Sequence, residues 1–96
     1  MEEKVLNLIK GTNEVADQFI NGDKNAISNL IKVIDGIQEM VNYLALKKVS
    51  KELIVELNSY LNQIIEAIEN GDITLIGDLM KYELVPMIEK LMRYVK

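Results

Sequence analysis

The chain has 96 residues with 11 basic and 15 acidic side chains, for a net charge of −4, and it contains no cysteine or histidine. These absences exclude disulfides, thiolate or imidazole metal ligands, thiol nucleophiles and histidine bases. The acidic balance argues against a nucleic acid as the main partner. We therefore expect one domain over residues 1–96, with no cofactor and no metal site.

No segment predicts export or membrane insertion. The N-terminus begins Met1-Glu2-Glu3 without a sustained apolar run, and no window of about eighteen apolar residues occurs. Isoleucine, asparagine and lysine, whose codons are rich in A and T, are abundant, as in proteins from low-GC bacteria. We expect a cytoplasmic bacterial protein with no membrane partner.

The first predicted helix spans residues 2–20. Its apolar side chains recur at steps of three and four, which places them on one face. Gly11 lies within this helix and costs roughly 1 kcal/mol relative to alanine, but the periodicity continues through it. Asn21-Gly22 ends the helix, because glycine adopts the left-handed conformation of a helix C-cap. The expected inward residues are Val5, Leu8, Ile9, Thr12, Val15, Ala16, Phe19 and Ile20.

A second helix is predicted from Asp23, a favourable N-cap, to about Leu46. Its apolar arc is wide, which predicts contact with more than one neighbour. In the segment 47–50, lysines favour a helix C-terminus and Ser50 can cap the next helix, but no glycine or proline forces a break. A break at 47–50 and one continuous rod are both open. The expected inward residues are Ala26, Ile27, Leu30, Ile31, Ile34, Ile37, Val41 and Leu44, with Val33 and Met40 widening the arc.

A third helix is predicted over residues 51–69 and ends at Asn70-Gly71. A fourth begins at its N-cap Asp72 and runs to about Val95. At 1.5 Å per residue, each helix is roughly 30 Å long. Four helices of similar length with short connections predict an all-α, antiparallel up-down four-helix bundle. The expected inward residues of the third helix are Leu53, Ile54, Leu57, Tyr60, Leu61, Ile64, Ile65 and Ile68.

Two segments of the chain resemble each other, at an offset of 49 residues. Residues 19–32 align with residues 68–81, and both contain Asn-Gly-Asp. A duplicated helical hairpin would explain the similarity. Convergence is the alternative, because this tripeptide both ends one helix and starts the next. The identical pairs are Asn21/Asn70, Gly22/Gly71, Asp23/Asp72, Ile27/Ile76, Leu30/Leu79 and Lys32/Lys81.

The last helix carries more apolar positions than one core-facing stripe needs. Its proline removes a backbone hydrogen bond and pushes on the carbonyl of Tyr82, so a proline kink over Tyr82–Pro86 would let the buried face rotate along the helix. Alternatively, the extra stripe docks a second chain or a partner helix. The ordinary stripe is Leu84, Met87, Ile88, Leu91 and Val95, and the extra stripe is Leu75, Leu79, Tyr82 and Pro86.

The extra stripe supplies the candidate interaction residues. We expect Leu79 to pack inside, because its counterpart Leu30 is a core position. Leu75 and Tyr82 are the expected exposed contacts. Glu83 lies between the stripes, and we expect its carboxylate either at the rim of the bundle or partly buried with a partner, because an unpaired buried carboxylate is costly. Structural pairing is the expected role, in preference to a functional acid. The full candidate set is Leu75, Leu79, Tyr82, Glu83 and Pro86.

The segment from Asn70 to Glu89 has the pattern N-G-D-x5-D-L-x-x-Y-E-L-x-P-x-x-E. It resembles a family of short, uncharacterised, all-helical bacterial proteins. In size and acidity the chain is also similar to flagellar export chaperones, which wrap or cap partner helices. These resemblances imply a helical fold and identify no catalytic residue.

The sequence favours a non-enzymatic helical-bundle module that binds a protein partner or self-associates as a homodimer. Glu-x-x-His metal motifs, phosphate-binding glycine loops and serine–base pairs do not occur. The alternative is a secretion or flagellar-type chaperone for a helical client. A third hypothesis is a small-molecule-binding protein or enzyme that uses Asp78, Tyr82 and Glu83, but nothing in their spacing favours it.

Overall fold

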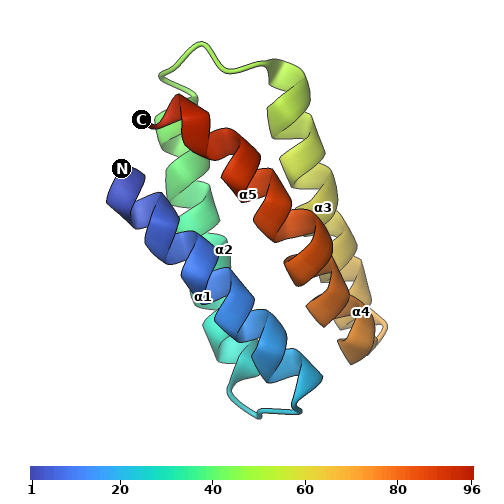
Figure 1. The fold of residues 1–96 in the computed structure, drawn as a ribbon. Coiled ribbons are helices and arrows are strands. Elements are labelled where there is room, and N and C mark those ends of the chain that lie inside the picture. The colour runs from blue at the N-terminus through green and yellow to red at the C-terminus, as the bar shows by residue number, and fades with distance from the viewer.

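Four helical segments account for 82% of the residues in the computed structural model, which describes residues 1–96 and contains no strand (Figure 1). The all-α prediction is confirmed. The first three segments are α1 (Glu2–Ile20), α2 (Ala26–Leu44) and α3 (Lys51–Glu69). The fourth is a continuous helical run made of α4 (Ile73–Leu79), the π-helical turn η1 (Met80–Leu84), α5 (Val85–Leu91) and the 3₁₀ turn η2 (Met92–Tyr94).

The helices form an antiparallel bundle with both chain termini at one end (Figure 1). The helix α1 packs closely against α2 and against the whole C-terminal run, and α3 packs against α4 and η1. The backbones of α2 and α3 have no comparable close approach. The bundle is therefore tightly closed on three sides and looser on the side between α2 and α3.

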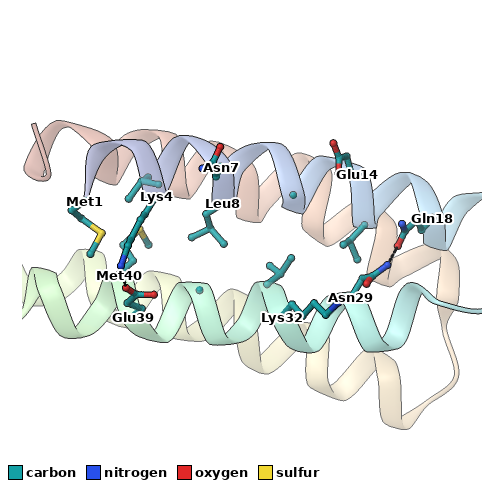
Figure 2. A pocket seen from close by; sticks show the side chains of 15 residues that line it. Met1, Lys4, Asn7, Leu8, Glu14, Gln18, Asn29, Lys32, Glu39 and Met40 are labelled. Carbon is teal, nitrogen blue, oxygen red and sulfur yellow. Dashed lines mark hydrogen bonds and ion pairs between the residues drawn. The ribbon is translucent and has the colours of Figure 1, made fainter.

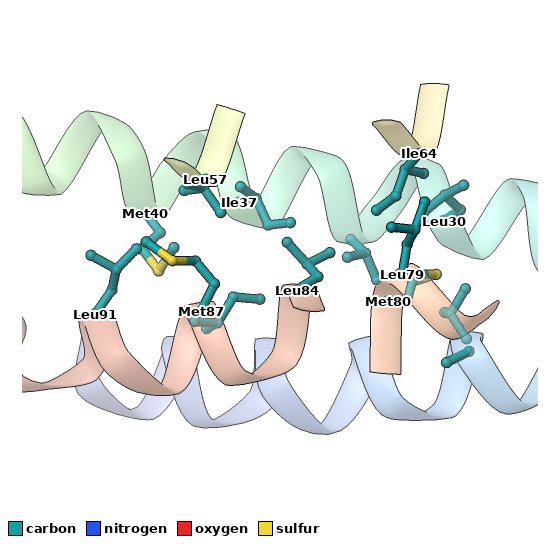
Figure 3. Packing of buried hydrophobic residues seen from close by; sticks show 14 of the residues in the cluster. Leu30, Ile37, Met40, Leu57, Ile64, Leu79, Met80, Leu84, Met87 and Leu91 are labelled. Atoms are coloured by element: carbon teal, nitrogen blue, oxygen red, sulfur yellow. The ribbon is translucent and has the colours of Figure 1, made fainter. Parts of the chain in front are cut away.

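The core lies between a layer formed by α2 and α3 and a layer formed by α1 and the C-terminal run (Figure 3). Thr12 is the only buried polar residue, and its hydroxyl donates to the Leu8 carbonyl at 2.7 Å. Most expected inward residues are buried or partly buried, and Met40 and Val33 are deeper than expected. The prediction was wrong for four isoleucines, which are about half exposed: Ile20, Ile27, Ile31 and Ile65.

The two Asn-Gly-Asp segments end α1 and α3 with the same backbone turn. Gly22 and Gly71 have φ values of +71° and +68°, the left-handed conformation that glycine adopts without strain. The N–H groups of Asp23 and Asp72 each donate to a carbonyl five residues back, both at 2.9 Å. This is the Schellman motif, and it confirms both predicted helix ends. Convergence and duplication both predict this shared turn, so the turn does not distinguish between them.

The two segments differ in the residues after the turn. Asp72 caps α4 as predicted, because its carboxylate accepts the N–H of Leu75 at 3.1 Å. The predicted N-cap at Asp23 was wrong. Its carboxylate accepts the N–H of Asn25 at 2.8 Å instead, and this local turn delays the start of α2 to Ala26.

The helices α2 and α3 are separate, so the continuous rod is excluded. The helix α2 ends at Leu44, two residues before the predicted boundary, and residues 45–48 form turns. Ser50 occupies the N-cap position of α3, but its hydroxyl donates to the Glu52 carboxylate and not to the helix backbone. That hydrogen bond, together with a backbone one, lowers the pKa of Glu52.

The expected proline kink takes the form of a π turn immediately before Pro86. The N–H of Val85 donates to the carbonyl of Met80, five residues back, and Pro86 lies in the first turn of α5. The wider turn accommodates a residue that lacks an N–H donor. It also keeps residues spaced by four on one face, although such steps drift by 40° in a regular α-helix. The buried residues at these steps are Ile76, Met80, Leu84 and Ile88.

Candidate interaction surfaces

The extra stripe of the C-terminal run does not form one surface. Leu79 is buried, with 7% exposure, beside Leu30 and Ile64 (Figure 3). Leu75 and Tyr82 are 42% and 66% exposed, and Pro86 is also exposed. The expected positions of these side chains are therefore confirmed. Their role in binding remains a prediction.

Glu83 lies near a polar link between α3 and the C-terminal run. The Tyr60 hydroxyl donates to Glu56 at 3.2 Å, and Lys90 lies 3.7 Å from the other oxygen of that carboxylate. Burial, the hydrogen bond to Glu56 and the charges of Glu56 and Glu83 raise the pKa of Tyr60. Glu83 itself is exposed and forms no ion pair, which places it at the rim of the bundle, the first of its two expected positions. The phenol of Tyr60 is its polar neighbour.

A groove of about 520 Å³ lies along the outer seam between α1 and α2 (Figure 2). Polar bridges cross it near both ends: Lys4 to Glu39 at 2.5 Å, and Asn29 to Gln18 at 2.9 Å. This groove was not predicted from the sequence. Four of the apolar side chains that line it are buried: Val5, Val15, Val33 and Met40.

Two mid-helix glycines shape the groove. A Cβ atom on Gly36 would lie 2.9 Å from Leu8 Cδ1, so glycine permits this contact between α1 and α2. A Cβ on Gly11 would meet nothing within 4 Å. A glycine inside a helix costs roughly 1 kcal/mol, and this cost was the only sequence signal that could have indicated the groove.

The helix α2 has an apolar flank that no other helix covers closely. Asn29, Gly36 and Glu39 mark the side of α2 that faces α1. By helical periodicity, an apolar stripe at steps of four and three lies on the opposite flank, towards α3. Ile27 and Ile31 are 48% and 56% exposed. The apolar residues of this flank are Ile27, Ile31, Ile34 and Val41.

The helix α3 has a matching flank. Glu56 and Tyr60 mark the side that faces the C-terminal run. The opposite flank, towards α2, carries a second stripe with the same spacing, of which Ile65 is 45% exposed. Its apolar residues are Ile54, Leu61, Ile65 and Ile68. We call the two flanks together the α2–α3 face.

Between Ile27 and Val41 and between Ile54 and Ile68, the α2–α3 face contains no charged position; Lys51, three residues before Ile54, is charged. Between the apolar residues, the stripes carry only the amides Gln38 and Asn58. A wide apolar arc on α2 was visible in the sequence, but Ile27, Ile31 and Ile65 were assigned to the interior. Periodicity shows that a helix has a broad apolar surface; it does not show whether the same chain covers it.

These features define an all-helical bundle protein with an exposed, uncharged apolar face. The structure has no group of three or more acidic, histidine or cysteine side chains that could hold a metal ion. None of its helices combines the length and apolar composition needed to cross a membrane.

The chain belongs to the family described as Domain of unknown function (DUF8042), whose model matches residues 1–94. The expectation of an uncharacterised family is thus confirmed. No curated protein and no solved structure matches the chain.

Proposed function

We propose that this protein is a non-enzymatic protein-interaction module of the bacterial cytoplasm, and that the α2–α3 face is its contact surface. The observation that carries the proposal is the exposure of three isoleucines, Ile27, Ile31 and Ile65, on the two apolar stripes of the α2–α3 face. Large exposed apolar patches on small proteins are often binding sites, because their burial against a partner is favourable. A single exposed isoleucine would not indicate a binding site.

The spacing of the face favours a helical occupant. Each stripe repeats at steps of four and three, the pattern that packs against another helix. This agrees with the chaperone alternative, in which a client helix lies along α2 and α3. It also agrees with a helix from a second copy of the chain.

The enzyme hypothesis has no support from a cavity. Asp78, Tyr82 and Glu83 are all exposed. They line neither the α1–α2 groove nor the hollow of about 230 Å³ between α3 and α4. Acid–base or binding chemistry needs side chains that converge on a substrate site.

Site-specific photo-cross-linking in cells tests the proposal. A photoreactive phenylalanine at Ile31 samples the face, and one at Val55 samples an exposed position of α3 outside it. We expect a discrete adduct from Ile31 that is missing or much weaker from Val55. Mass spectrometry then identifies the cross-linked chain and the residue contacted. Equal labelling from both positions, or no adduct from either, would contradict the proposal.

A further inference from the structure

We propose that the α2–α3 face binds the same face of a second copy, forming a twofold-symmetric dimer. This proposal rests on the proposed function and specifies that the partner is a second copy of the chain. Three properties of the face favour it: its charge, its symmetry and its size.

The charge distribution favours a copy of this chain. Each chain carries a net charge of −4, so two copies repel each other over most of their surfaces. Between their first and last apolar residues, the two stripes have no charged position, and their polar positions are the neutral amides Gln38 and Asn58. Two acidic copies can therefore bring these faces together without opposing like charges. A partner selected by charge would have nothing to recognise here.

The geometry of the face suits twofold pairing. The helices α2 and α3 are antiparallel neighbours of 19 residues each, so they present two stripes of equal length (Figure 1). Rotation about a twofold axis in the plane of the face places every helix against an antiparallel helix of the copy.

The size of the face predicts weak, concentration-dependent association. Two helices about 28 Å long and each about 10 Å wide offer on the order of 600 Å² per copy, compared with about 800 Å² in a standard interface. An interface below the standard size supports a dimer with a dissociation constant in the micromolar range or weaker. We therefore expect monomer at low concentration and dimer at high concentration.

Sedimentation equilibrium measures this association directly. We expect the wild-type mass to rise from 10.9 kDa towards twice that value as concentration increases from about 5 to 500 µM. Added salt should strengthen the dimer, because it screens the repulsion between the copies. A mass of 10.9 kDa at every concentration would overturn the proposal.

Lysine substitutions locate the interface. Ile31→Lys and Ile65→Lys each place two lysines in the twofold interface, and we expect at least a tenfold weaker dimer. Val55→Lys makes the same change in charge at a 63% exposed position of α3 outside the face, and should dimerise like wild type. Thermal melts check that all three variants are folded. Equal dimerisation by all three, or equal loss in Val55→Lys, would contradict the assignment.

Cross-linking separates failure of the dimer from failure of the proposed function. If wild type stays monomeric while Ile31 cross-links to a different protein, the dimer is wrong and the interaction module stands. A monomeric wild type with no adduct from Ile31 contradicts both.

Discussion

Leu79 offers a sharp test of how the C-terminal run divides between core and surface. It lies on the extra apolar stripe with Leu75, four residues earlier, but only Leu79 is buried, with 7% exposure against 42%. If that stripe were a contact surface throughout, both leucines would tolerate truncation in the monomer. Because Leu79 packs beside Leu30 and Ile64, Leu79→Ala should instead open a cavity there (Figure 3).

The size of the effect depends on burial. Truncation of a buried leucine to alanine costs about 2–5 kcal/mol, and the slight exposure of Leu79 places it near the lower end, at about 2–3 kcal/mol. For a domain of this size, that loss lowers Tm by about 10–20 °C. Leu75→Ala is the matched control, with the same substitution one helical turn away and an expected cost below about 1 kcal/mol.

Thermal melts recorded by circular dichroism, together with urea unfolding, measure both variants. Leu79→Lys adds an unpaired charge at the same site and should be less stable than Leu79→Ala. A melting temperature for Leu79→Ala within about 3 °C of wild type would refute this division between core and surface. An equal loss of stability in Leu75→Ala would refute it as well.

The packing, the pKa of Tyr60 and the composition each give a further prediction. A Cβ on Gly77 would lie 3.1 Å from Ile20 Cγ1 and 3.3 Å from the backbone oxygen of Ala16, so Gly77→Ala should crowd the contact between α1 and α4 and be less stable than Gly11→Ala. Gly11→Ala has free space and should stabilise the fold by up to about 1 kcal/mol. Melts that rank the two variants the other way would contradict this packing. The raised pKa of Tyr60 means that its neutral phenol stabilises the fold below the ordinary pKa of 10.0 and that this contribution is lost as the pH rises through the raised value. The difference between the alkaline absorbance titrations of wild type and Tyr60→Phe should isolate the Tyr60 phenol, with a pKa above 10.0. A Tyr60 pKa below 10.0 would contradict the effect assigned to its surroundings. Without histidine or cysteine the protein should retain no transition metal, so stoichiometric zinc after dialysis would be contrary to expectation.

Local chemistry made the helix ends predictable. Asn21-Gly22 and Asn70-Gly71 end α1 and α3 where expected, because the left-handed glycine and the Schellman hydrogen bonds need only adjacent residues. The start of α2 was not predictable in the same way. Asp23 and Asp72 are the same residue after the same turn, yet only Asp72 caps a helix, because the carboxylate of Asp23 accepts a nearer N–H.

Features that depend on packing were harder to predict. Pro86 predicted where the last helix departs from regular geometry. It did not predict a π turn, because that turn also depends on the packing of Met80 and Leu84 in the core. The α2–α3 face shows the same limit. Ile27 and Ile31 have the spacing of core residues, and only the arrangement of the other helices shows that they are left half exposed.

Methyl NMR tests most directly whether the α2–α3 face is the contact between two copies of the chain. In a protein labelled at isoleucine δ1 methyl groups, a dilution series reports each isoleucine separately. We predict that Ile27, Ile31 and Ile65 shift with concentration, whereas the buried Ile88 and the exposed Ile73 at the start of α4 do not. Shifts confined to Ile73, or no concentration dependence for any isoleucine at millimolar protein, would contradict a contact between two copies through α2 and α3.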